Sequence, residues 1–206
     1  MPSSTSGSPI SGNEFAGNGN YAIKLVGVAK NVKAYGNIWD AETQRRINET
    51  SVACFQNLPV IYDRFDNSGL GLVIYNPVEV FGALAITQNT VWSAARSPYV
   101  LDGDLQVAAG ATLTIEPGVA IYVQRGIAIR VSGTLQAPGT AAQPISFLPA
   151  NCTNPQPGDW QGLIFNSSVG SVLNYCLIRN AMTGILQPSW RSPASDACAS
   201  QAMGDR

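Results

Sequence analysis

The chain has 206 residues, a formal net charge of −1 and only 12% charged residues, so it carries no evident basic patch that would indicate nucleic-acid binding. No apolar run reaches the length of about 18 residues that would indicate a membrane span. The sequence contains no histidine, which excludes imidazole-dependent catalytic triads and removes the commonest near-neutral general base.

The first third of the chain alternates short apolar runs with turn residues. Residues 1–11 are small and polar, lack the basic region and apolar core of a signal peptide, and are expected to be disordered. Residues 12–82 contain apolar runs at 21–26, 32–39 and 58–66. Between these runs, residues 41–48 hold neither glycine nor proline, so we predict one short helix there.

Residues 87–180 form a ladder of short apolar strands separated by Gly, Pro and Asn. Similar elements recur roughly every 20 to 25 residues, as expected for stacked structural repeats. The run 112–114 (Thr-Leu-Thr) returns at 134–136 (Thr-Leu-Gln), and 120–123 (Ala-Ile-Tyr-Val) returns at 144–147 (Pro-Ile-Ser-Phe).

Two all-β architectures fit such a ladder, an antiparallel sandwich and a parallel solenoid. The strands repeat in groups of two or three and end in turn residues after short intervals, which favours a parallel β-helix. The apolar positions predicted to point into its core are Leu113, Ile115, Ile121, Ile145, Ile164 and Ile178. Residues 188–206 lose the strand pattern and are expected to form a disordered tail.

Several of these stretches resemble a known fold family. The segments 110–118, 131–135 and 158–165 are similar to the opening coils of bacterial right-handed parallel β-helix proteins with the pectin-lyase-like fold, and the resemblance covers residues 87–181. Residues 12–80 resemble the closing coils of such proteins, with 36–39 (Gly-Asn-Ile-Trp) similar to their terminal signature. The resemblance implies closing coils over 12–82, opening coils over 83–187 and an extracellular or cell-surface location.

The segment that resembles closing coils precedes the segment that resembles opening coils. This order leaves three explanations open. The chain is a junction cut from two tandem solenoids, a short gene product derived from such a protein, or two pieces that stack into one compact unit. For the partial-solenoid explanation we expect exposed strand edges to favour self-association. The apolar segment 78–86 is expected to strengthen that tendency.

The resemblance does not imply an activity, because this fold hosts lyases, hydrolases, epimerases, adhesins and structural stalks. Polygalacturonase-like members carry a Gly-His-Gly motif that a histidine-free chain lacks. Lyase-like members combine a catalytic Arg with clustered acidic calcium ligands. Arg125 and Arg130 are present here without such a cluster.

Three pairs of residues have both a functional and a structural interpretation. Asp102 and Asp104 share a face if extended and could hold Ca²⁺, but that cation takes six or more oxygens, which favours a turn. Asp63 and Asp66 could be a glycosidase pair, although their place in the closing coils favours a capping or turn role. The third pair, Trp92 and Trp160, could stack on sugars, but packing at coil corners is favoured.

The four cysteines are far apart, without the Cys-x-x-Cys spacing of a zinc site. For Cys176 we favour a buried thiol on a strand face shared with Val172, Asn174 and Ile178, with a Cys152–Cys176 disulfide as the alternative in an exported protein. The remaining two are Cys54 and Cys198.

Several asparagines have structural or modification roles to consider. Asn37, Asn174 and Asn180 suit ladders or turns at solenoid corners. The glycosylation pattern occurs at Asn48, Asn151 and Asn166 and matters only in a eukaryotic host.

No catalytic, cofactor-binding or metal-binding residue is therefore assigned, and no cofactor is expected. The sequence predicts a noncatalytic structural or surface-interaction β-helix segment of a larger extracellular or cell-surface bacterial protein. The alternatives are a remnant of a polysaccharide-active lyase or hydrolase, or a carbohydrate-binding module. Expected partners are a polysaccharide or another protein, including a second copy of the chain.

Overall fold

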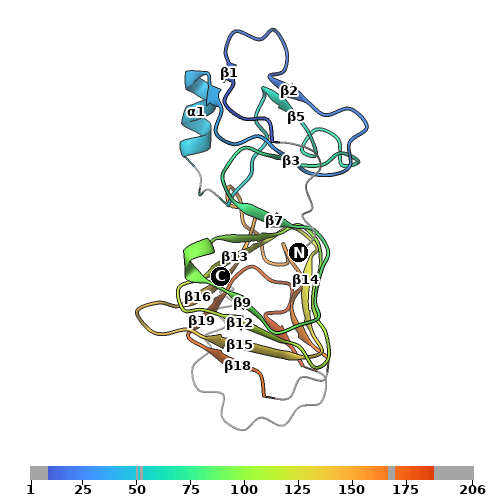
Figure 1. Cartoon of the computed structure of the whole chain (residues 1–206), viewed down its shortest axis with the longest axis vertical. Coiled ribbons are helices and arrows are strands. Elements are labelled where there is room, and N and C mark those ends of the chain that lie inside the picture. The colour runs from blue at the N-terminus through green and yellow to red at the C-terminus, as the bar shows by residue number, and fades with distance from the viewer. Residues whose placement is uncertain (1–8, 50, 52, 167–169, 188–206) are drawn as a thin grey trace, which may run out of the picture. The chain divides into compact units, whose positions relative to one another are not determined.

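The structure, a computed structural model, describes residues 9–49, 51, 53–166 and 170–187. The predicted disordered tail, 188–206, and most of the predicted disordered start, 1–11, lie outside the described residues. The chain divides into two compact units, Met1–Val80 and Phe81–Arg206 (Figure 1). Each unit is described by itself.

The strands of the second unit visit three parallel sheets in rotation, so each strand lies beside the strand three places earlier in the chain. Figure 1 shows these sheets as the sides of a triangle around the core. The first sheet contains β7 (Glu79–Phe81), β10 (Tyr99–Leu101), β13 (Ala120–Val123), β16 (Ile145–Pro149) and β19 (Cys176–Ile178). The second contains β8 (Leu84–Ile86), β11 (Leu105–Val107), β14 (Ala128–Val131), β17 (Gly162–Phe165) and β20 (Ile185–Leu186). The third contains β9 (Thr90–Trp92), β12 (Thr112–Ile115), β15 (Thr134–Pro138) and β18 (Val172–Asn174), and a 3-10 turn, η1 (Ala94–Arg96), follows β9.

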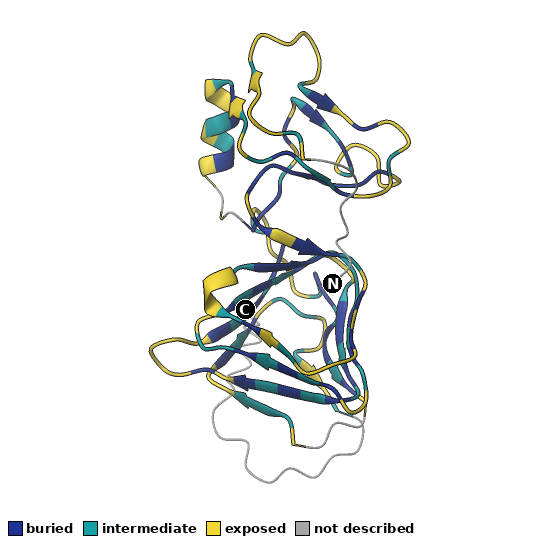
Figure 2. Cartoon of the chain, viewed as in Figure 1, coloured by how far each residue is buried: buried dark blue, intermediate teal, exposed yellow. Residues whose placement is uncertain are grey.

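Every strand pair with a determined register in these sheets is parallel. The predicted all-β parallel β-helix is therefore confirmed, and the sandwich is excluded. The strand sequences explain the coil: β12 alternates threonines outside with Leu113 and Ile115 inside, and β15 has the same alternation (Figure 2).

Glycines allow the tight corners and close approaches that this stacking requires. Gly118 adopts a φ of 81° in the turn before β13, a conformation that side chains disfavour. A Cβ at Gly162 would lie 1.7 Å from the carbonyl oxygen of Thr183 in the next coil. Only glycine therefore lets these two backbones approach so closely.

The predicted internal repeat is confirmed in one place and shifted in another. Thr112 pairs with Thr134 and Leu113 with Leu135, as the repeated Thr-Leu predicts. Ala120 pairs with Ser146, two residues beyond the predicted match with Pro144. A slip of two residues preserves which side chains face inward, so hydrophobic alternation alone could not detect it.

The core of the second unit contains five of the six apolar residues that we predicted to face inward. These buried residues are Leu113, Ile115, Ile121, Ile145 and Ile178. The prediction for Ile164 is wrong, because Ile164 is only half-buried and pairs with the outward-facing Arg130, whereas the preceding Leu163 is fully buried. Two adjacent aliphatic residues carry no signal for which of them faces the core.

The first unit contains short parallel strand pairs and one helix. β1 pairs with β4, β2 with β5 and β3 with β6, so two successive passes of the chain lie side by side in the same order. The strands are β1 (Glu14–Phe15), β2 (Ile23–Lys24), β3 (Val32–Lys33), β4 (Ile38–Trp39), β5 (Ile61–Tyr62) and β6 (Val73–Ile74). The origin of this unit as closing coils stays a prediction.

The predicted helix over 41–48 is confirmed as α1 (Ala41–Asn48). Asp40 caps its N-terminus, because its carboxylate accepts a hydrogen bond from the backbone N–H of Thr43 at 3.0 Å. On the exposed surface, Glu42 forms ion pairs with Arg45 and Arg46. These bonds hold the pKa of Glu42 down at about 2.

The large apolar residues of segment 78–86 are buried, whereas the sequence led us to expect them to be exposed. Val78, Val80, Phe81, Leu84 and Ile86 are all buried. They are core residues of the folded chain and therefore do not form the exposed apolar surface that we expected to promote self-association.

Two substitutions on β12 and β17 test the inward and outward assignments. Ile115→Asp should lower the free energy of unfolding by about 3 kcal/mol or more, because it places an unpaired charge in the core. Ile164→Asp should cost less than about 1 kcal/mol, because that side chain is half-buried and lies beside Arg130. Urea unfolding measures both values, and equal losses would contradict the assignment.

Candidate functional site

Asp104 is a structural bracket between two coils. Its Oδ1 accepts a hydrogen bond from the backbone N–H of Ala128 at 2.9 Å, and its Oδ2 lies 3.4 Å from Nε of Arg130. Both side chains are partly exposed, so the ion pair contributes little, about 0–1 kcal/mol, and the bond to the buried backbone of Ala128 is the larger contribution.

The two arginines do not share a common acidic site. Arg125 is exposed in the turn between β13 and β14, and Arg130 pairs with Asp104. In the part of the chain that the structure describes, no group of three or more Asp, Glu, His or Cys side chains could hold a metal ion. Asp102 and Asp104 flank Gly103 in a bend, as the turn interpretation predicted.

Asp104 belongs to a recurring arrangement at the three corners of one coil. In each case a polar side chain accepts a hydrogen bond from the first backbone N–H of the neighbouring strand in the next coil, 23 or 24 residues on. The three bonds are Asn89 Oδ1 to Thr112 N at 3.0 Å, Ser97 Oγ to Ala120 N at 3.0 Å and Asp104 Oδ1 to Ala128 N at 2.9 Å. Sequence reasoning missed Asn89 and Ser97. The signal was a polar residue one or two positions before each strand.

Asp63 and Asp66 form a turn in the first unit, as predicted. Asp63 is buried, and its carboxylate accepts hydrogen bonds from the backbone N–H of Val73 at 2.8 Å and of Phe65 at 3.0 Å. The Asp66 carboxylate accepts from the backbone N–H of Asp63 at 3.1 Å. Burial raises the pKa of Asp63, and the two backbone donors oppose that shift.

Neither candidate sugar-stacking tryptophan is exposed. Trp160 is fully buried, and its Nε1 donates to the carbonyl oxygen of Arg179 at 2.8 Å. Trp92 lies in an aromatic stack with Tyr99, 4.6 Å between ring centroids, and with Phe81, 6.0 Å away. The Nε1 of Trp92 is buried, and no described residue forms a hydrogen bond with it. Both rings are therefore packing elements of the core.

The cysteines show which of the two interpretations applies. Cys54 and Cys152 are disulfide-bonded, and Cys176 is a buried cysteine outside any disulfide, so a Cys152–Cys176 disulfide is excluded. Cys176 shares its strand face with Ile178, whereas 172 and 174 belong to β18 in another sheet. The predicted shared face is wrong because Tyr175, with φ 45°, turns the corner between β18 and β19. Cys198 lies outside the described residues.

The predicted asparagine ladder is present in the first unit. Asn37 Oδ1 accepts from the backbone N–H of Asn13 at 3.0 Å, and its Nδ2 donates to the carbonyl oxygens of Ile10 and Ala34, each at 2.7 Å. Asn180 occupies a turn with φ 56°. The Asn37 side chain thus satisfies backbone groups between neighbouring passes of the chain, whereas Asn174 is the last residue of strand β18.

The three glycosylation patterns have exposed asparagines, but Asn151 is already bonded. Its Nδ2 donates to the carbonyl oxygen of Asn154 at 2.7 Å. Asn48 and Asn166 are exposed too, and each lies within two residues of a position that is not described.

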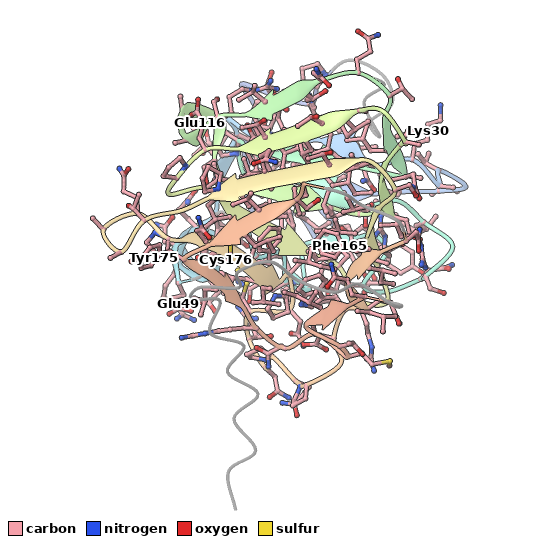
Figure 3. All side chains as sticks on the ribbon, turned by 90° about the horizontal axis from the view of Figure 1, so that it is seen from below. Lys30, Glu49, Glu116, Phe165, Tyr175 and Cys176 are labelled. Carbon is pink, nitrogen blue, oxygen red and sulfur yellow. The ribbon has the colours of Figure 1, made fainter. Side chains whose placement is uncertain are left out.

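The last coil of the second unit exposes apolar side chains. Tyr175, Met182, Ile185 and Leu186 are exposed, although earlier coils bury most of their aliphatic residues. Figure 3 looks onto the sheet β9-β12-β15-β18, with Tyr175 and Cys176 labelled at the end where β18 lies.

No helix in the described ranges is long and apolar enough to span a membrane.

Comparison with known proteins finds a family match within the second unit. Residues 84–171 match the family described as a pectate-lyase-like β-helix domain. The curated protein named Protein bark beetle, from Drosophila melanogaster, is 40% identical over 55 residues. That segment covers 27% of this chain and 2% of the fly protein, so the chain spans a very small part of this relative. No solved structure matches the chain significantly.

Two substitutions separate the bracket role of Asp104 from a calcium site. Asp104→Ala should lower the free energy of unfolding by about 1–3 kcal/mol, because it leaves the buried N–H of Ala128 without an acceptor. Asp104→Asn retains an oxygen there and should recover most of the loss. Thermal unfolding with and without Ca²⁺ is the measurement. A Ca²⁺-dependent rise in Tm that Asp104→Asn abolishes would contradict the bracket role.

The buried carboxyl of Asp63 predicts a distinctive pH dependence. Because its folded pKa is raised, Asp63 contributes stability that is present below the unfolded pKa of about 4 and is lost as the pH rises through the folded pKa. The stability of Asp63→Asn relative to the parent should therefore increase with pH above about 4. Glu42→Gln is the control of opposite sign, since the pKa of Glu42 is lowered. Urea unfolding at a series of pH values checks both slopes, and a pH-independent difference for Asp63→Asn would contradict the prediction.

Proposed function

Because residues 84–171 belong to the pectate-lyase-like β-helix family, we propose that the chain is a noncatalytic structural or surface-interaction segment of a larger extracellular or cell-surface protein. The observation that carries this proposal is that the candidate reactive side chains stabilise the fold itself. Asp104 and Asp63 accept backbone N–H groups, and Trp92 and Trp160 are buried. These four residues are thus structural parts of the fold.

The outer surface of the third sheet suits contact better than chemistry. Its outward-facing residues on β12 and β15 are Thr112, Thr114, Thr134 and Gln136, which pair in register across the two strands. Uncharged side chains on a regular sheet offer hydroxyl and amide groups at fixed spacings. Such a surface supports binding to a polysaccharide or to another protein.

The proposed location rests on the cysteines as well as on the family. Disulfides persist in oxidising compartments, so the bonded states of Cys54 and Cys152 support export. The bacterial host implied by the resemblance stays a prediction. The 55 residues that match the fly protein make up 2% of it, which supports the idea that this sequence is part of a longer protein.

The absence of catalysis is tested on the whole purified chain. Incubation with pectate, polygalacturonate, alginate or chondroitin, with and without Ca²⁺, should release no unsaturated product and no new reducing ends. The physical reason is the absence of histidine from the sequence and the structural use of the acidic side chains. Heat-unfolded protein provides the background rate.

Turnover that persists through purification and disappears in an Asp102→Asn/Asp104→Asn double variant would contradict the proposal and support the alternative of a polysaccharide-active enzyme. Binding to one of these polymers without turnover, measured by calorimetry, would favour a carbohydrate-binding module. In-frame β-helix coils on both sides of this sequence in its gene would support the larger-protein part of the proposal.

A further inference from the structure

We propose that Asn18 is a site of spontaneous covalent modification, at which the side-chain amide is lost and a mixture of aspartate and isoaspartate forms. Asn18 lies in the loop between β1 and β2 and is followed by Gly19. It is the only asparagine of the sequence that precedes a glycine. The reaction belongs to the first unit and does not depend on the proposed interaction role.

The reaction needs only these two residues and water. The backbone nitrogen of Gly19 attacks Cγ of Asn18, and a new N–Cγ bond forms. The side-chain amide group leaves as ammonia, taking up the proton that the Gly19 nitrogen gives up. Water then opens the resulting five-membered imide at one of its two carbonyl carbons. Opening at Cγ gives aspartate, and opening at the backbone carbonyl carbon gives isoaspartate, in which the main chain runs through the former side chain.

The local structure leaves this attack unhindered. Gly19 has no side chain to shield its nitrogen, and its backbone rotates more freely than that of any other residue type. A Cβ at Gly19 would meet no other atom within 4 Å. Asn18 and Gly19 are both exposed, and no hydrogen bond joins either of them to another described residue. The fold therefore does not hold the Asn18 side chain away from the attacking nitrogen.

Asn67 provides a comparison within the same unit. It is also exposed and precedes another small residue, Ser68. However, its Oδ1 accepts a hydrogen bond from the backbone N–H of Gly69 at 3.0 Å, and its own N–H donates to the carbonyl oxygen of Asp63 at 3.0 Å. This turn fixes the side chain on its own backbone, and attack by the Ser68 nitrogen would have to break it. Folding should therefore protect Asn67 and leave Asn18 reactive.

The modification changes the surface charge of the loop and leaves the packing intact. Either product carries a carboxylate at neutral pH. Residues 16–39 contain Lys24, Lys30 and Lys33 and neither Asp nor Glu, so their formal charge of +3 falls to +2. Because Asn18 is exposed and forms no hydrogen bond with a described residue, its conversion should leave the unit folded.

Ageing of the full purified chain at neutral pH, followed by peptide mapping with mass spectrometry, tests the site. The peptide that contains Asn18 should gain the mass difference between an amide and a carboxyl group. Parallel ageing in guanidinium chloride gives the rates of the unfolded chain. At Asn18 the folded and unfolded rates should be similar. At Asn67 the folded rate should be at least about fivefold lower, which corresponds to one hydrogen bond of about 1 kcal/mol.

Two variants and one further assay identify the mechanism. Gly19→Ala should slow the reaction at Asn18 several-fold, because the added methyl group hinders the attacking nitrogen, and the open space around Gly19 accommodates it. Asn18→Gln should abolish the reaction, since the longer side chain does not form the five-membered imide. Labelling by an isoaspartyl methyltransferase should detect isoaspartate in the aged parent chain, whereas direct hydrolysis of the amide yields aspartate alone.

Three results would overturn the proposal. The first is an Asn18 that stays unmodified in the folded chain while the unfolded chain reacts. The second is a Gly19→Ala chain that is folded by circular dichroism and reacts at the parent rate. The third is a product that contains aspartate without isoaspartate.

Discussion

The second unit depends on one constraint: each strand must find its backbone partner in the coil before it. Its sheets are parallel throughout the pairs with a determined register, so a strand gains hydrogen bonds only if the chain returns to the same side of the core after a full circuit. The circuit between Asn89 and Thr112, or between Asp104 and Ala128, takes 23 or 24 residues. Three features stabilise each strand beside its partner in the preceding coil: the corner acceptors, the glycine contacts and the columns of inward side chains.

The repeat made the architecture of this unit predictable. Short β-branched runs between glycines indicated strands, their recurrence indicated coils, and the repeated Thr-Leu even gave the register of β12 and β15. Prediction failed where the chemistry is degenerate. Leu163 and Ile164 are both aliphatic, so hydrophobicity could not decide which faces inward. The predicted match of Ala120 with Pro144 was wrong, because a shift of two residues leaves the alternation of inward and outward side chains unchanged.

The candidate site was predictable only as a set of favoured structural roles. Asp63 and Asp104 had carried catalytic or calcium alternatives, and the structure shows their carboxylates bonded to backbone N–H groups. Asn89 and Ser97 have the same use as Asp104, yet nothing in their residue type distinguishes a corner acceptor from an ordinary turn residue. Their partners lie a full coil away in sequence. Such a bond becomes visible only after the register is known.

Circuit length is constrained less strictly than strand pairing. The hydrogen bond from Leu135 N to Ser171 Oγ spans 36 residues, against 23 for the equivalent span between Asn89 and Thr112, although β15 and β18 still pair in parallel. The additional residues leave the coil at its corners and return without disturbing the strands. Corners of this kind can accumulate insertions during evolution while the core stays the same. They are accordingly the positions at which a foreign peptide could be grafted and displayed on a rigid support.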